Sequence, residues 1–125
     1  MAITHLTVGS NDLERSRKFY DAALAPLGLK RLHDMPHGFM YGEKGAELLV
    51  IKPRDGAPAS NGNGFTVGFA APNRAAVDEF HKQALANGGV DEGAPGPRDF
   101  APNAYCAYAR CPDGHKVVAV SMGGV

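Results

Sequence analysis

The sequence has no excess of charge of either sign. It holds 13 basic and 13 acidic residues, so its formal net charge is zero. Proteins that bind nucleic acids neutralise phosphates with clustered lysine and arginine, and the chain has no such cluster. It also lacks an apolar run of membrane-spanning length and a basic leader before an apolar segment. We therefore expect a cytoplasmic protein without a nucleic-acid or membrane partner.

Cysteine is scarce as well. The chain has two, Cys106 and Cys111, whereas a small protein stabilised mainly by disulfide bonds needs more. A C-x₄-C spacing without a second pair of ligands is not a zinc signature. We expect two reduced thiols, one in a strand and one at a turn. With 125 residues, 44% of them hydrophobic, the chain can form a buried core without disulfide bonds.

What the sequence does contain is an internal repeat. Residues 1–29 read as a strand with one histidine (I-T-H-L-T-V), a turn, and a helix that closes on P-L-G-L. In a weaker second copy, His5 falls on Thr66, Phe19 on Phe80 and Gly28 on Gly89. A capping box at Asn11 and Glu14 is expected to start the first helix, and Asn73 is expected to cap the second.

Short strands and turns complete each copy. Three strands are expected after the first helix, and a linker rich in proline and glycine follows them. After the second helix we expect a weak strand near Val90, a loop over 93–103, and a hairpin that turns at Pro112-Asp113-Gly114. The pattern predicts one α+β domain of two βαβββ modules, with the helices outside a curved sheet whose concave face binds ligands. The expected bounds are 1–52 for the first module, 53–63 for the linker and 64–122 for the second module.

Three segments, in this order, resemble the vicinal oxygen chelate superfamily of glyoxalase I, bleomycin-resistance and extradiol dioxygenase proteins. They are the opening I-T-H-L-T-V, the helix F-Y-D-A-A-L-A-P-L-G-L and the late C-P-D-G-H-K-V-V. The resemblance spans about residues 2–121. It implies an open, incomplete barrel, a small-molecule ligand and a homodimer. In catalytic members it further implies a divalent metal (Zn, Ni, Mn or Fe), held by side chains from the first and last strand of each module.

The metal positions of that family are poorly filled here. His5 matches the first-strand histidine, but its counterpart is Thr66, and the position of the usual late glutamate is Val118. The remaining position falls near Leu49, with Glu47 two residues away on the same face. A catalytic metal requires three or more protein ligands and an open coordination position. Since only His5 and Glu47 are available, we expect a degenerate metal site and no bound cofactor.

Several side chains are candidates for contact with a ligand, and each has a structural alternative. His5 either contacts the bound molecule or is a core histidine satisfied by a hydroxyl such as that of Thr66. Either of the two arginines expected at the rim, Arg98 or Arg110, suits an anionic ligand. Tyr41, Tyr105 and Tyr108 either line the pocket or fill the strands. The predicted ligand-binding set is His5, Thr66, Tyr41, Tyr105 and Arg110, whereas His33, His37 and His115 are expected to be solvated.

Three functions remain open. The first is a binding protein for a small organic molecule, like bleomycin-resistance proteins, with a degenerate metal site. The second is a metal-dependent lyase or dioxygenase of the glyoxalase type (lactoylglutathione lyase-like) that uses His5 and Glu47. The third is a non-catalytic dimeric interaction protein.

Overall fold

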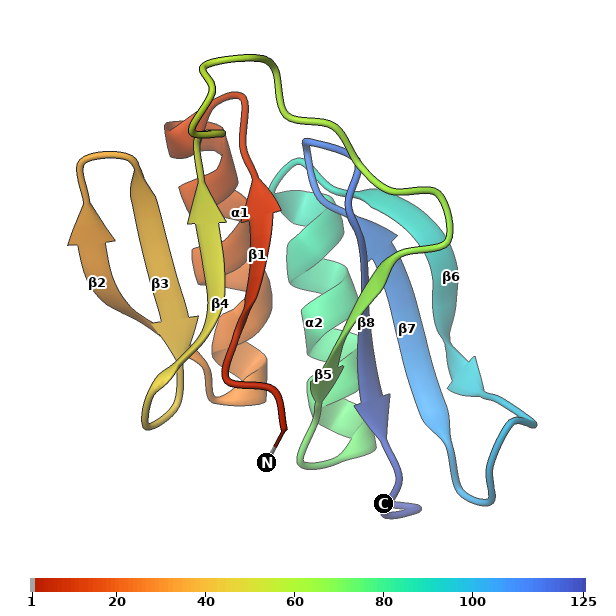
Figure 1. Cartoon of the computed structure of the whole chain (residues 1–125). Coiled ribbons are helices and arrows are strands. Elements are labelled where there is room, and N and C mark those ends of the chain that lie inside the picture. The colour runs from red at the N-terminus through yellow and green to blue at the C-terminus, as the bar shows by residue number, and fades with distance from the viewer. Residues whose placement is uncertain (1) are drawn as a thin grey trace.

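Each half of the chain builds one four-stranded sheet and one long helix in a computed structural model that describes residues 2–125 (Figure 1). The sheets are ordered β1-β4-β3-β2 and β5-β8-β7-β6, and neither closes into a barrel. In each sheet the first and last strands of the module pair in parallel and the other pairs are antiparallel. The predicted α+β class and open architecture are confirmed. The first half comprises β1 (Leu6–Gly9), α1 (Leu13–Leu24), a 3₁₀ turn (Ala25–Leu27), β2 (Lys30–Met35), β3 (Gly38–Gly42) and β4 (Ala46–Ile51), and the second comprises β5 (Thr66–Ala70), α2 (Arg74–Ala86), β6 (Val90–Pro97), β7 (Tyr105–Arg110) and β8 (Lys116–Ser121).

Alternation along the strands divides each sheet into two faces. Apolar residues at every second position of β3 and β4 are buried on the side of α1, and the apolar residues of α2, spaced by helical turns, pack against β6, β7 and β8. The two helices lie side by side on one side of both sheets, so the other side of each sheet carries no helix (Figure 1). No helix within residues 2–125 is long and apolar enough to cross a membrane. The core includes Phe19, Leu24, Tyr41, Leu48, Val50, Val77, Phe80 and Val117.

The cap of α1 differs from the prediction. Asp12, not Asn11, is the N-cap, and its carboxylate accepts a hydrogen bond from the Arg15 backbone N–H at 3.1 Å. The capping box expected from Asn11 and Glu14 is therefore wrong. The Asn11 amide instead pairs with the linker, accepting from the Ala59 N–H at 2.7 Å and donating to the Ala59 carbonyl at 3.3 Å. The predicted Asn73 cap of α2 is confirmed by its bond to the Ala76 N–H at 2.8 Å.

The loop expected over 93–103 is shorter than predicted. β6 runs from Val90 to Pro97 and pairs with β7, with irregular register on either side of Gly93. Bulges let a strand carry glycine and proline that would disrupt a regular ladder. The sequence pattern of this strand therefore looked like a loop.

The two sheets share no strand pair within the described residues, so side chains must fix their relative position. Asp113, in the β7–β8 turn, reaches the start of α1 in the other module. Its carboxylate is 1% exposed and accepts bonds from the Asn11 N–H (3.0 Å), Arg15 Nη2 (2.9 Å) and Ser16 Oγ (2.9 Å). We call these four residues the Asp113 junction.

His115 forms a second tie between the modules. It is 5% exposed, and its Nε2 lies 2.8 Å from the carbonyl oxygen of Gly9. Since a carbonyl only accepts, Nε2 donates. The expectation of a solvated His115 is therefore wrong, because its partner lies at the far end of the sequence.

We predict that Asp113→Asn destabilises the protein. The amide places an N–H₂ group among donors that need an acceptor, and a buried donor left unpaired costs about 2 kcal/mol. The midpoint of thermal unfolding should fall by about 6–10 °C for a chain of this size. Asp99→Asn, which changes an exposed carboxylate in the β6–β7 loop, is the control and should leave the midpoint unchanged. Equal midpoints for the two variants would contradict a structural role for the junction.

Candidate functional site

We call the helix-free side of both sheets the open face, and strand register shows which residues share it. In the second sheet, Gly68 pairs with Val118, which pairs with Tyr108 on its other side. In the next row, Lys116 lies between Thr66 and Arg110. Residues directly opposite one another in a sheet project to the same face. These two rows therefore bring two family metal positions, Thr66 and Val118, onto adjacent strands.

The first sheet presents a matching row. Thr7 of β1 pairs with Leu49 of β4, which pairs in turn with Met40 of β3. Leu48 and Val50, the neighbours of Leu49 in the strand, are buried in the core, so Leu49 faces away from the helices. The third family metal position is thus also on the open face, and it carries an apolar side chain.

His5 lies just before β1 and is exposed, which excludes the core interpretation. Its Nδ1 is 3.0 Å from the hydroxyl of the adjacent Thr4, not that of Thr66. Glu47 is also exposed, and its carboxylate lies 3.4 Å from the Glu43 N–H.

These residues do not fit a divalent metal centre. Nowhere in residues 2–125 do three or more His, Cys, Asp or Glu side chains come together to hold a metal ion. Valine has no donor atom, and its isopropyl group occupies the position where the family has a carboxylate. We therefore assign no step of any reaction to a metal held by this set.

Two of the tyrosines predicted to bind a ligand lie on the helix side. Tyr41 is 1% exposed and donates to Asp21 of α1 at 2.9 Å; burial, followed by this bond, raises the pKa of its phenol. Tyr105 donates to Asp78 of α2 at 2.6 Å, and that bond is the main reason for its raised pKa. Both phenols are held as donors to helix carboxylates. We leave Tyr41 and Tyr105 out of the proposed site.

The cationic candidates for ligand contact lie on the second sheet. Arg110 Nε donates to Glu92 at 2.8 Å, and this bond lowers the pKa of the Glu92 carboxyl. Arg98 and Lys116 both lie against the ring of Tyr108, at 5.6 and 5.0 Å from its centroid. Arg98 and Arg110 were expected near the rim, but Lys116 was missed. Its position two residues before Val118 on one strand was the available signal.

Both thiols are free and buried. Cys111 belongs to the core between helices and sheets, whereas Cys106 lies outside it. Burial raises the pKa of the Cys106 thiol, which lowers its reactivity. The expectation of two unpaired thiols is confirmed, and neither is a candidate nucleophile.

Two cavities lie next to the open face. One of about 210 Å³ is at the seam between the sheets, where Leu6 and Glu47 meet Gly68 and Ala70 of β5. The other, of about 340 Å³, lies beneath the linker and is lined by Thr7, Gly9, Ile51, Pro53, Asp55, Pro58, Ala59 and Ser60. The second cavity falls within the range of about 300–1,000 Å³ that is typical of ligand pockets, and the first is smaller.

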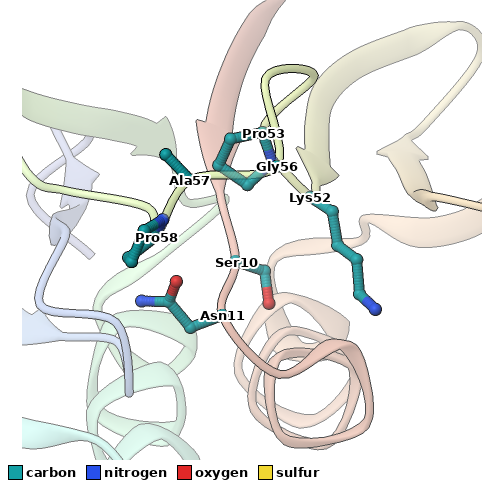
Figure 2. Close-up of a pocket in the computed structure, with 7 residues that line it drawn as sticks. All are labelled: Ser10, Asn11, Lys52, Pro53, Gly56, Ala57 and Pro58. Carbon is teal, nitrogen blue, oxygen red and sulfur yellow. The ribbon is translucent and has the colours of Figure 1, made fainter.

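A third cavity, of about 310 Å³, belongs to the joint between linker and α1 (Figure 2). Linker residues cross over Ser10 and Asn11, and the Asn11 side chain is directed toward Pro58 (Figure 2). The hydroxyl of Ser10 lies 2.6 Å from that of Ser16, and the Asn11 amide is bonded to Ala59. Because both polar groups are already satisfied by the protein, we do not assign a ligand to this cavity.

Residues 2–118 match the family model of the Glyoxalase/Bleomycin resistance protein/Dioxygenase superfamily. The structure is similar to the crystal structure of a glyoxalase/bleomycin resistance protein from Albidiferax ferrireducens. The TM-score is 0.87 and the identity 40%, over 97% of this chain and 98% of that one.

More distant structures share the fold. A glyoxalase-related enzyme from Fulvimarina pelagi has a TM-score of 0.74 at 20% identity, over 97% of this chain and 88% of that one. A lactoylglutathione lyase from Agrobacterium tumefaciens has a TM-score of 0.61 at 23% identity, over 96% of this chain and 92% of that one. No curated protein matches the sequence.

Proposed function

Because this chain belongs to the glyoxalase/bleomycin resistance protein/dioxygenase superfamily, we propose that it binds a small organic molecule on its open face without the family's metal. The supporting observation is the placement of Thr66 and Val118. Both lie on the open face, at positions that the superfamily uses for metal ligands. The fold is kept, whereas Val118 has no donor atom and Thr66 offers only a hydroxyl.

The residues proposed to contact the molecule are those of the predicted set that face the open side or border it. Thr66 supplies a hydroxyl on β5, the edge strand of the second sheet, and Arg110 supplies a guanidinium two strands away in the same row. His5 is exposed just before β1; its Nδ1 lies 3.0 Å from the Thr4 hydroxyl, and its Nε2 is the nitrogen proposed to bond a ligand. Gly68, which has no side chain, leaves room above Val118.

A blocking substitution tests this function. A Cβ at Gly68 would meet only the Val118 side chain, at 3.5 Å, which is an ordinary contact. Gly68→Leu should therefore fold and fill the open face. Compounds of a metabolite library that bind the wild type should raise its unfolding midpoint. For the same compounds we expect dissociation constants at least about tenfold higher with Gly68→Leu than with the wild type.

The matched control is Gly45→Leu, in the exposed β3–β4 turn, where an added Cβ meets nothing within 4 Å. It should bind library compounds as the wild type does. If no compound stabilises the wild type, or if the two leucine variants lose binding equally, the proposed site is contradicted. Complete absence of binding would favour the interaction-protein alternative.

Metal analysis tests the alternative of a lyase or dioxygenase that uses His5 and Glu47. We expect less than stoichiometric Zn, Ni, Mn and Fe after mild purification, because too few donors converge. We also expect His5→Ala to have the same metal content as the wild type. A stoichiometric metal that His5→Ala loses, together with lactoylglutathione lyase or ring-cleavage turnover, would establish the alternative.

We also infer that the protein is a homodimer, as the resemblance implies; its cytoplasmic location stays a prediction. Support comes from large apolar side chains left exposed, among them Ile3, Phe100, Met122 and Val125. Exposed apolar surface of this kind is often covered by a partner. Light scattering coupled to size exclusion should give twice the mass of 13.1 kDa. A monomer mass at micromolar concentration would refute the dimer.

A further inference from the structure

Arg98 is held in a seat built by the backbone of β6. Its Nη1 donates to the carbonyls of Gly96 (2.9 Å) and Pro97 (3.2 Å), and its Nη2 donates to that of Ala94 (2.9 Å). A Cβ on Gly93 or Gly96 would come within 3.3 Å of the guanidinium nitrogens. The two glycines therefore provide the space, and the register shifts of β6 around them occur at the same place.

This seat fixes the guanidinium without neutralising it. Carbonyl groups are neutral acceptors, so Arg98 keeps its full positive charge. Within residues 2–125, Arg98 forms no ion pair with a carboxylate. By contrast, ion pairs with carboxylates are formed by Arg15, Arg17, Arg31 and Arg110.

Lys116 places a second positive charge against the same aromatic ring. Its Nζ lies 5.0 Å from the centroid of the Tyr108 ring, and the Arg98 Cζ lies 5.6 Å from that centroid. No ion pair or hydrogen bond of the Lys116 ammonium occurs in the described part of the chain. Glu92, an acid of this region, is already bonded to Arg110. Two cations held against one ring raise the local positive potential and favour an anion beside them.

Donors for that anion are present. A guanidinium has five N–H donors, and the three bonds to the β6 carbonyls leave two of them without a protein partner. The ammonium of Lys116 adds more. Arg98, Tyr108 and Lys116 are all half-buried, so their charges are screened less than those of extended surface side chains.

We propose that Arg98 and Lys116, packed against Tyr108, form a subsite for the carboxylate or phosphonate of a small organic anion. This inference rests on the proposed function, because it names the chemical class of the molecule bound on the same open face. The carbonyl seat pre-orients Arg98, so little side-chain freedom is lost when the anion binds.

Benzoate, phenylphosphonate and the neutral benzamide are suitable probes in nuclear magnetic resonance titrations of the full chain at low ionic strength. We expect saturable amide shifts for the two anions at Gly93, Ala94, Gly96, Arg98, Tyr108 and Lys116. Benzamide should bind at least about tenfold more weakly, and added salt should weaken the binding of both anions. Benzamide binding as tight as benzoate binding, or shifts confined to other parts of the chain, would overturn the subsite.

Variants separate charge from structure. Arg98→Gln and Lys116→Met should each weaken benzoate binding about tenfold, whereas Arg54→Gln, an exposed linker arginine, should not. Arg98→Gln removes bonds within β6 and its folding needs a check by circular dichroism. Lys116→Met removes none of these bonds, so its effect alone decides the question if Arg98→Gln fails to fold. Wild-type affinity for benzoate in Lys116→Met would overturn the proposal.

The outcomes distinguish this inference from the function on which it rests. If neutral library compounds bind and Gly68→Leu blocks them, while benzoate shows no preference over benzamide, small-molecule binding stands and the anion subsite falls. If neither anion binds at millimolar concentration, the anion subsite is refuted regardless of the library result.

Discussion

The placement of the two modules depends on a buried carboxylate, that of Asp113 in the turn between β7 and β8. Within residues 2–125 no strand pairing joins the two sheets, so the seam between them is held by packing of the helices, by the Asp113 junction and by the bond from His115 to Gly9. Gly114, at φ +88°, makes the turn that delivers Asp113 to the first turn of α1. The backbone carbonyl of the same aspartate accepts from Asn61 at 3.1 Å, so the linker is tied to the same point. Both modules and the linker thus meet at one side chain, and the geometry of the open face follows from that meeting.

Local rules predicted the elements of the fold because each is determined by nearby residues. The strand alternation, the helical stripes and the Asn73 cap are all consequences of spacing within a few positions. The errors have a common cause in distant partners. Asn11 looked like a cap, yet its amide binds Ala59, and His115 looked solvated, yet it donates to Gly9. The residues of one segment do not reveal which backbone groups of a distant segment will need a hydrogen-bond partner.

The site was predictable in position but only partly in composition. The resemblance placed Thr66 and Val118 on neighbouring strands, and their register agrees. Whether Tyr41 and Tyr105 face the helices or the open face depends on their exact position in the alternation of the strand. A shift of one residue moves a side chain from one face of the sheet to the other. Lys116 was identifiable only after Val118 had been placed on the open face.

Loss of the metal donors changes what the open face attracts. A face that holds a divalent cation needs carboxylates or imidazoles that converge, and its carboxylates repel anions unless the metal is present. Here the middle of the second sheet offers glycine, valine and tyrosine, while the charges left beside it are Arg98, Lys116 and the Arg110–Glu92 pair. Both cations are held against the ring of Tyr108, and a bound anion beside the ring is attracted by both charges. The carbonyl seat of Arg98 maintains that arrangement when no ligand is present, because it satisfies the guanidinium without cancelling its charge. Electrostatic selectivity on this face therefore favours anions over the neutral or cationic molecules that a carboxylate-lined site would accept.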